Sequence, residues 1–161
     1  ASRATCPWTS RTTMNASDLI AELAQRTGLS QLTLSADGTA CLVVEDSLPI
    51  NIEHDAASRR LHLYTVLGPL PASDREACYG RLLEANLFGL QTGGGSIGLH
   101  RPGSQIVLSR TLDLDILDYT AFEAALEQMV QSAGPLKDLL DAGPAVDTSA
   151  PDPRLAHLLR G

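Results

Sequence analysis

The chain has 161 residues, of which 43% are apolar and 19% charged, and its formal net charge is -7 with a pI near 4.9. This length corresponds to about one domain with a substantial core, whereas the acidic charge argues against nucleic acid or an anionic membrane as the main partner. The longest apolar run, ACLVV, is far too short to span a bilayer. Cys6, Cys41 and Cys78 form no C-x-x-C pair, and so sparse and odd a count is typical of a reducing cytoplasm.

The first residues, ASRATCPWTSRTT, differ from the rest of the chain because they lack any apolar period. We expect residues 1–13 to be either a non-native extension ahead of a natural start at Met14 or a disordered arm. A single domain is expected over residues 14–143. The remaining segment, 144–161, is rich in Pro, Ala and Asp and is expected to be a loose tail.

The first part of the domain predicts a helix followed by strands. Ser17 is a candidate N-cap, and Gly28 is placed to end the helix. The stretch LTLSADGTACLVVED contains two strand-like runs around Asp37-Gly38, a hairpin turn signal. LPINIEH and RLHLYTVL then alternate apolar and polar residues, which is typical of strands.

The second part predicts a helix, two strands and another helix. Ser73 with Glu76, and later Thr120 with Glu123, have capping-box spacing. SIGLH and QIVLSRTLDL are predicted strands joined by a turn at residues 101–103. Gly134-Pro135 is expected to kink or interrupt the last helix. Because strands cluster apart from helices, the order predicts an α+β fold with a twisted, mainly antiparallel sheet.

The segment Gly94-Gly95-Ser96-Ile97-Gly98 matches the serine-hydrolase pattern G-x-S-x-G. A nucleophile elbow needs a strand before this turn and a helix after it, whereas the order here is reversed. The glycines are therefore interpreted as a structural link in which the backbone turns at little steric cost. A small hydrolase using Ser96 is the least favoured alternative.

Other patterns of catalytic or metal-binding residues are weak. The histidines stand singly, without the spacing of a metal site. The pairs Glu45-Asp46 and Asp113/Asp115 are interpreted as solvated strand-end carboxylates, and Cys41 as a buried, inert thiol. We predict no catalytic residue, no metal and no cofactor.

The stretch LLEANLFGLQTGGGSIGLHRPGSQIVLSRTLDLDILDYTAFEAALEQMV carries a family resemblance. A helix ends in Asn86-Leu87-Phe88, and a Gly-rich link, a strand, a Gly-containing turn, an apolar strand, an acidic segment and a long helix follow. This order resembles the Tir-chaperone family, the class I type III secretion chaperones. The helix and strand order matches over residues 15–142.

The resemblance implies a non-enzymatic homodimer in the bacterial cytoplasm. Such a protein holds the N-terminal chaperone-binding segment of a secreted effector in extended form, without ATP, and presents it to the secretion apparatus, with the secretion ATPase as a further partner. The two-fold contact is expected on the helix over residues 73–87 and the strand after it. The predicted dimer residues are Cys78, Tyr79, Leu82, Leu83, Asn86 and Leu87.

The effector surface is predicted from side chains that the domain's own core does not need. Leu42 and Val44 alternate with Cys41 and Val43, so both faces of that strand are apolar, and one face needs a partner. The sequence does not decide which face is outward. The predicted effector-binding residues are Leu19, Leu23, Leu42, Val44, Ile50 and Ile52. An unrelated dimeric α+β peptide-binding adaptor is the main alternative.

Overall fold

The computed structural model describes residues 14–45 and 47–142. The predicted arm at residues 1–13, the predicted tail at residues 144–161 and the proposed domain end at Gly143 lie outside the described residues.

The fold has one antiparallel sheet and three α-helices in the described part of the chain. The predicted α+β class is confirmed, with three strands in the first cluster, since residues 32–35 form no strand. The sheet has five strands in the order β1-β2-β3-β5-β4, and every neighbouring pair is antiparallel. The elements are α1 (Ala16–Thr27), β1 (Thr39–Val44), β2 (Leu48–Asp55), β3 (Arg60–Pro69), α2 (Arg75–Asn86), a 3-10 turn η1 (Leu87–Gly89), β4 (Ser96–His100), β5 (Gln105–Asp113) and α3 (Tyr119–Asp141).

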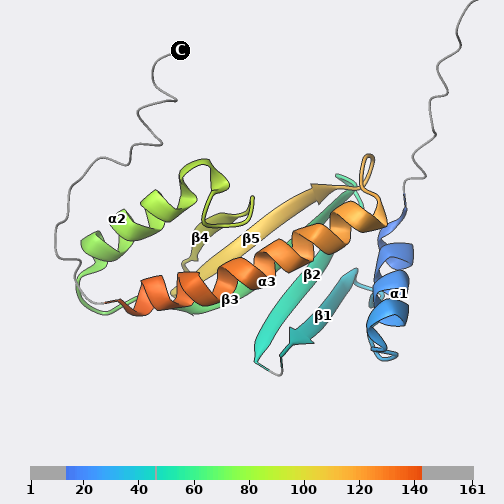
Figure 1. The fold of residues 1–161 in the computed structure, drawn as a ribbon, viewed down its shortest axis with the longest axis horizontal. Coiled ribbons are helices and arrows are strands. Elements are labelled where there is room, and N and C mark those ends of the chain that lie inside the picture. Colours follow the sequence, from blue (N-terminus) through green and yellow to red (C-terminus); the bar gives the residue numbers. More distant parts are fainter. Residues whose placement is uncertain (1–13, 46, 143–161) are drawn as a thin grey trace, which may run out of the picture.

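Helix α3 lies along one face of the sheet, over β3 and β5 (Figure 1). Helix α1 and strand β1 lie at one end of the molecule, and α2 with β4 lies at the opposite end (Figure 1). Among the described residues, no helix covers the other face, which we call the open face. The molecule therefore has two layers, and all three helices lie on one side of the sheet.

The core lies between α3 and the sheet. In β3 the alternating residues Leu61, Leu63, Thr65 and Leu67 are buried, as the strand period of two requires. Helix α3 places Phe122, Met129 and Leu136 against them, and burying each such side chain contributes about 1.5–3 kcal/mol. This parity sends the intervening residues of β3 to the open face.

The helices begin at residues other than the predicted caps. Asn15 caps α1, because its Oδ1 accepts a hydrogen bond from the Asp18 N–H at 2.8 Å. Asp118 caps α3 in the same way, through the Ala121 N–H at 2.8 Å. Helix α2 begins after Asp74, which makes no side-chain cap. The predictions of Ser17, Ser73 and Thr120 as caps were wrong, since several Ser, Thr, Asn and Asp residues near each start compete for one role.

Helix α3 continues through Pro135, so the interruption that the sequence allowed there does not occur. A proline inside a helix removes one hydrogen bond and crowds the preceding turn. Leu136 and Leu140, on the same helix, are both buried against the sheet side of the molecule. The burial of this last segment offsets the cost of the proline, so the helix stays continuous as far as Asp141.

Within residues 14–45 and 47–142, none of the helices combines the length and the apolar character that crossing a membrane requires.

Candidate interaction surfaces

Helix α2 and the turn after it carry large apolar side chains on the outside of the molecule. Leu83, Phe88 and Leu90 are 69%, 65% and 73% exposed. Tyr79, Leu87 and Leu99 are also exposed. We call this set, defined as Tyr79, Leu83, Leu87, Phe88, Leu90 and Leu99, the α2 surface. A hollow of about 300 Å³ adjoins it between α2 and β4.

Two apolar stripes on α2 explain why this surface exists. Cys78, Leu82 and Ala85 follow one another at helical spacing and are buried. Tyr79 and Leu83 lie one position further along and form a second, outward stripe. The prediction that Cys78 and Leu82 are dimer residues is corrected, because their side chains pack in the core of their own chain. The prediction for Tyr79, Leu83 and Leu87 agrees with their exposure but stays untested.

The turn after α2 presents Phe88 outward at a conformational cost. Phe88 has φ of 56°, in the left-handed region that bulky residues rarely adopt. Gly89 beside it has φ of 70°, which glycine adopts readily. Phe88 and Leu90 were not among the predicted site residues. The Asn-Leu-Phe turn was the sequence motif that could have pointed to these two residues. Their exposure, however, depends on the geometry of the turn.

Asn86 is bound to its own chain. Its Oδ1 accepts a hydrogen bond from the Ile97 N–H at 2.6 Å, and its Nδ2 donates one to the Ile97 carbonyl oxygen at 3.0 Å. Asn86 was predicted as a dimer residue, but its side-chain amide is used to hold the end of α2 against β4. Any role in a dimer therefore acts through the position of α2.

The glycine-rich link between η1 and β4 packs closely on its surroundings. A Cβ at Gly93, where φ is +58°, would lie 2.8 Å from the Gln128 carbonyl oxygen. Arg110 donates hydrogen bonds from Nη1 to the Gly93 carbonyl oxygen and to Gln128 Oε1, both at 2.6 Å. The Thr92 hydroxyl donates to the Gly95 carbonyl oxygen at 2.6 Å. This link has the structural role that the sequence predicted for it.

Ser96 is exposed at the first position of β4, after the glycine link rather than at the end of a strand. The strand–turn–helix geometry of a nucleophile elbow is therefore missing at this residue. In the part of the chain that the structure describes, no group of three His, Cys, Asp or Glu residues is placed to hold a metal ion.

The opposite end of the molecule corrects the predicted effector surface. Five of the predicted residues are buried in the core of this chain: Leu19, Leu23, Leu42, Ile50 and Ile52. Val44 is half-buried and packs against the same core. The prediction that these side chains are free for a partner was wrong for the five buried residues. Leu42, Ile50 and Ile52 lie on the helix side of the sheet, and α1 packs Leu19 and Leu23 into the same core.

The alternate residues of β1 are the ones that point outward. Cys41 is exposed, contrary to the predicted buried thiol, and Val43 is 54% exposed. In the ladder between β1 and β2, Cys41 faces Asn51 and Val43 faces Pro49, so both belong to the open face. One face of β1 is thus left without a cover in the described structure, as the alternation predicted. It is the face of Cys41 and Val43, not the face of Leu42 and Val44.

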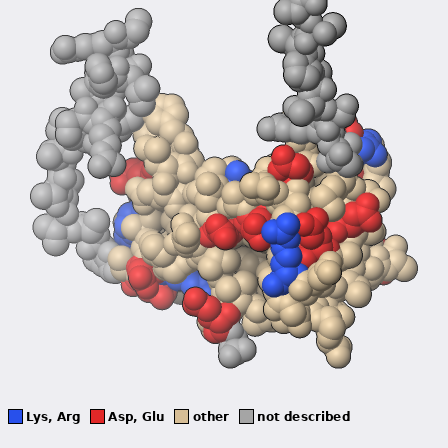
Figure 2. Space-filling model, turned by 45° about the vertical axis from the view of Figure 1, so that its right-hand side comes forward, with Lys and Arg blue, Asp and Glu red and all other residues tan. Residues whose placement is uncertain are grey.

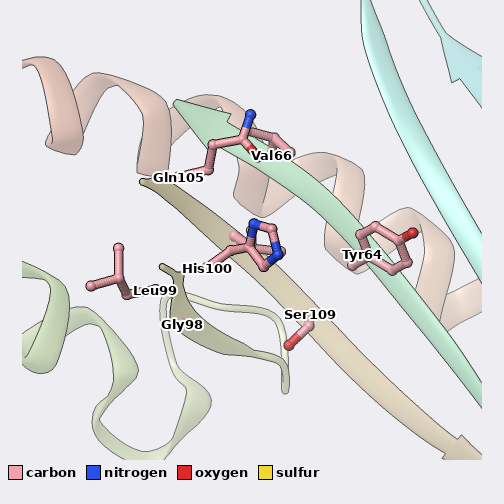
Figure 3. A pocket seen from close by; sticks show the side chains of 8 residues that line it. Tyr64, Val66, Gly98, Leu99, His100, Gln105 and Ser109 are labelled. Atoms are coloured by element: carbon pink, nitrogen blue, oxygen red, sulfur yellow. The ribbon is translucent and has the colours of Figure 1, made fainter. Parts of the chain in front are cut away.

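The open face continues across the middle of the sheet as a shallow hollow of about 470 Å³. Figure 3 shows its side chains gathered from β3, β4 and β5, on the side of the sheet away from α3. The hollow is lined by Tyr64, Val66, Gly98, Leu99, His100, Gln105, Val107 and Ser109. Val66 and Val107 are half-buried and face each other across the β3–β5 ladder, so the floor of the hollow is partly apolar.

The charged side chains around α1 and α3 form a separate cluster. Figure 2 shows acidic side chains gathered in a band across one face of the molecule, with few basic ones among them. Arg26 pairs with Glu22 at 2.7 Å and lies 4.3 Å from the centre of the Tyr119 ring. Burial, followed by the hydrogen bond that the hydroxyl donates to Glu123, raises the pKa of Tyr119 to about 12.

Comparison with known proteins gives matches over most of this domain. The sequence pattern that defines the Tir chaperone protein (CesT) family matches residues 18–137. A protein of Chlamydia pneumoniae is 33% identical over 82 residues. That alignment covers 50% of this chain and 62% of the relative, so the match spans less than two thirds of the relative's length.

Solved structures share the fold at low sequence identity. The ExsC–ExsE complex matches with a TM-score of 0.66 and 21% identity, over 83% of this chain and 100% of the other chain. The HopA1–SchA chaperone–effector complex matches with a TM-score of 0.64 and 16% identity, over 75% and 91%. The Yersinia pestis type III secretion chaperone SycH, solved with a fragment of YscM2, matches with a TM-score of 0.59 and 20% identity, over 76% and 99%.

Proposed function

Because this chain belongs to the Tir chaperone protein (CesT) family, we propose that it is a type III secretion chaperone. It binds the N-terminal chaperone-binding segment of a secreted effector in extended form and keeps that segment soluble and competent for secretion, without ATP. The observation that carries the proposal is the family match over residues 18–137, which spans nearly all of the described domain. Two of the similar folds were solved as a chaperone–effector complex and as a type III secretion chaperone with a bound fragment.

The working form in this proposal is a homodimer that forms through the α2 surface. Monomeric proteins seldom leave so many large apolar side chains together on one surface. A two-fold contact uses the same patch on both subunits, so Leu83 and Phe88 would pack against their copies or near them. The left-handed backbone of Phe88 supports this site, since strained residues tend to lie where function requires them.

The effector segment is proposed to lie on the open face and along β1, with contacts to Val43, Tyr64, Val66 and Val107. These residues replace the buried ones that the sequence predicted. An extended peptide places alternate side chains on one side, so its apolar residues can enter the hollow over β3 and β5. The net charge of -7 favours a basic effector segment at long range. Most of the affinity is expected from apolar burial.

The protein is proposed to act by binding alone, in the bacterial cytoplasm, with the secretion ATPase as a further partner. Ser96 has no catalytic role in this proposal, because a chaperone needs no covalent step. The exposed Cys41 is consistent with a reducing compartment, where a surface thiol stays free.

Co-expression tests the proposed function. The chain is produced together with the N-terminal segment of the protein encoded by the neighbouring gene, because such chaperones are often encoded beside their effectors. We expect the two to purify as one complex that persists at high salt. The matched control is the remainder of the same neighbouring protein without its N-terminal segment, which should not purify with the chain. Retention of the remainder but not of the N-terminal segment would contradict the proposal.

A further inference from the structure

The open face is apolar toward one end of β3 and charged toward the other. Residues that lie directly opposite each other in an antiparallel ladder turn their side chains to the same face of the sheet. The side chains of the open face therefore form rows that cross the sheet from strand to strand. Such rows pass through Val66, Tyr64, His62 and Arg60 of β3.

The row through Val66 is apolar. Val66 lies opposite Val107 of β5, and Val107 lies opposite Gly98 of β4. A Cβ at Gly98 would meet nothing within 4 Å, so the space above this residue is free. All three residues line the hollow of about 470 Å³ (Figure 3). An apolar side chain of a partner can therefore lie on the two valines.

The row through His62 carries an unpaired carboxylate. His62 lies opposite Glu53 of β2 and Thr111 of β5, and its Nδ1 is 3.0 Å from the Thr111 hydroxyl oxygen. Glu53 is exposed. In the described part of the chain, no group forms an ion pair or a hydrogen bond with the Glu53 carboxylate. This carboxylate is therefore free to bind a cation of another molecule.

The row through Arg60 adds further negative charge. Arg60 lies between Asp55 of β2 and Asp113 of β5. Since two carboxylates face one guanidinium in this row and Glu53 lies in the next, this end of the open face has an excess of negative charge. By contrast, the rows through Val66 and Tyr64 contain no charged residue.

We propose that the open face recognises an effector segment by an apolar and a basic side chain four residues apart. Consecutive residues of a strand are about 3.3 Å apart along its axis, so the rows through Val66 and His62 are about 13 Å apart. An extended segment that runs along β3 turns every second residue to the sheet, so its residues i and i+4 span the same distance. Its apolar side chain then lies on Val66 and Val107 while its basic side chain binds Glu53.

The contacts in this arrangement are made by side chains above the sheet and need no backbone pairing at a sheet edge. The proposal rests on the proposed function, because it takes the partner to be an extended effector segment. The apolar contact supplies affinity, whereas the ion pair with Glu53 is exposed and decides mainly which segments bind. The spacing is the same for either direction of the segment.

Two short acetylated and amidated peptides of equal composition test the spacing. Both consist of serine and threonine with one leucine and one lysine. In the first peptide, the lysine follows four residues after the leucine, so both side chains turn to the same side of an extended chain. In the second, the lysine follows after three residues and turns to the opposite side. Binding to the full chain is measured by NMR titration, in which the amide signals of β2, β3 and β5 report the site.

We expect the first peptide to bind about two- to fivefold more tightly than the second, the range for an exposed ion pair. Glu53→Lys should abolish this difference. Glu127→Lys is the matched control, because Glu127 is an exposed glutamate of α3 on the opposite side of the sheet and its replacement changes the net charge by the same amount. This control should leave the difference intact. Val66→Thr should weaken the binding of both peptides alike.

Equal binding of the two peptides by the wild type, or no binding of either, would overturn the proposed spacing, and so would a difference that persists in Glu53→Lys. Amide shifts that avoid Val66 and Glu53 would place the site elsewhere and also overturn it. Glu53→Gln replaces Glu53→Lys if the latter does not fold. The co-expression experiment decides the proposed function separately. An effector segment that is retained while the peptides bind alike would leave the chaperone function standing and refute the spacing, and a clear preference without retention would do the reverse.

Discussion

Helices α1 and α2 both have 12 residues, yet they distribute their apolar side chains differently. Helix α1 has a single apolar face, with Leu19, Ile20 and Leu23 buried and charged residues outside. Helix α2 buries Cys78 and Leu82 and still leaves Leu83 exposed beside them. Helix α1 thus buries its apolar side chains within its own chain, whereas the α2–β4 end leaves large apolar side chains exposed. An apolar residue near a predicted site is therefore a poor guide to binding unless its direction is known.

The largest effect is expected from a charge placed in the core beneath α1. Leu19→Asp puts a carboxylate into a fully buried position, at a cost of about 4 kcal/mol or more. Since whole domains are stable by only about 5–15 kcal/mol, the variant should be largely unfolded or insoluble. Urea denaturation followed by circular dichroism measures the loss. A variant as stable as the wild type would mean that α1 does not pack as described.

A leucine-to-aspartate substitution at the α2–β4 end should separate the subunits of the proposed dimer and leave the fold intact. Leu83→Asp would place two like charges in the proposed two-fold contact, while the isolated chain keeps its core. Sedimentation equilibrium should show that the variant is a monomer. Urea denaturation should show that this monomer is still folded. Leu29→Asp is the matched control, because Leu29 is an exposed leucine outside the α2 surface and its change should leave the dimer intact. A wild type that is monomeric at micromolar concentration would refute the proposed dimer.

The glycine link joins η1 to β4 and packs against α3 through Gln128. Gly93→Val combines a positive φ with a Cβ that has no room beside Gln128, and should destabilise the protein by about 2 kcal/mol. Gly98→Val is the control, since a Cβ at Gly98 meets nothing within 4 Å. Thermal unfolding of both variants gives the difference. Equal losses for the two would show that the link is not closely packed.

Alkaline pH should lower the free energy of unfolding through Tyr119, the first residue of α3, whose ring contacts Arg26 of α1. Its pKa rises from 10.0 in the unfolded chain to about 12 in the folded one, so the unfolded state loses the proton first. The stabilisation is complete below pH 10 and is lost as pH rises toward 12, by about 1–2 kcal/mol. Urea denaturation between pH 9 and pH 12 should show this fall, and Tyr119→Phe should remove that part of the slope. A slope that is identical in both proteins would exclude Tyr119 as its source.

The smallest effect is expected at Ser96. Ser96→Ala changes an exposed side chain and should alter stability by less than about 0.5 kcal/mol. Binding of the effector segment should not change either. Hydrolysis of generic esters is measured in parallel for the wild type and the variant. An esterase activity that disappears in folded Ser96→Ala would restore the enzymatic alternative.

The fold could be predicted where one periodic pattern prevailed. In β3, apolar residues at every second position identified both the strand and its buried face. In β1, Leu42 and Val43 are equally apolar, so the sequence predicted a strand but could not tell which face the helices cover. The cap positions failed for a related reason, because Asn15 and Ser17 are both good caps and only the geometry selects one.

The candidate site was predictable only in part. The family resemblance placed the expected dimer contact on α2. The second apolar stripe of this helix is visible in the sequence as Tyr79 and Leu83. The exposure of Phe88 depends on a left-handed turn that bulky residues rarely adopt, so no local preference indicates it. The contact between Asn86 and Ile97 joins two elements across the glycine link, and a pattern within a single element does not contain such information.

The strand order also has a consequence for synthesis on the ribosome. β3 pairs with β2 on one side and with β5 on the other, but β5 begins only at Gln105, after α2 and β4. A nascent chain that has reached α2 therefore carries a three-stranded meander with the β3 edge unpaired, and such edges are prone to aggregate. Closing the long connection to β5 also costs loop entropy and slows folding. A chain that is proposed to keep another protein from aggregating thus passes through an aggregation-prone stage of its own.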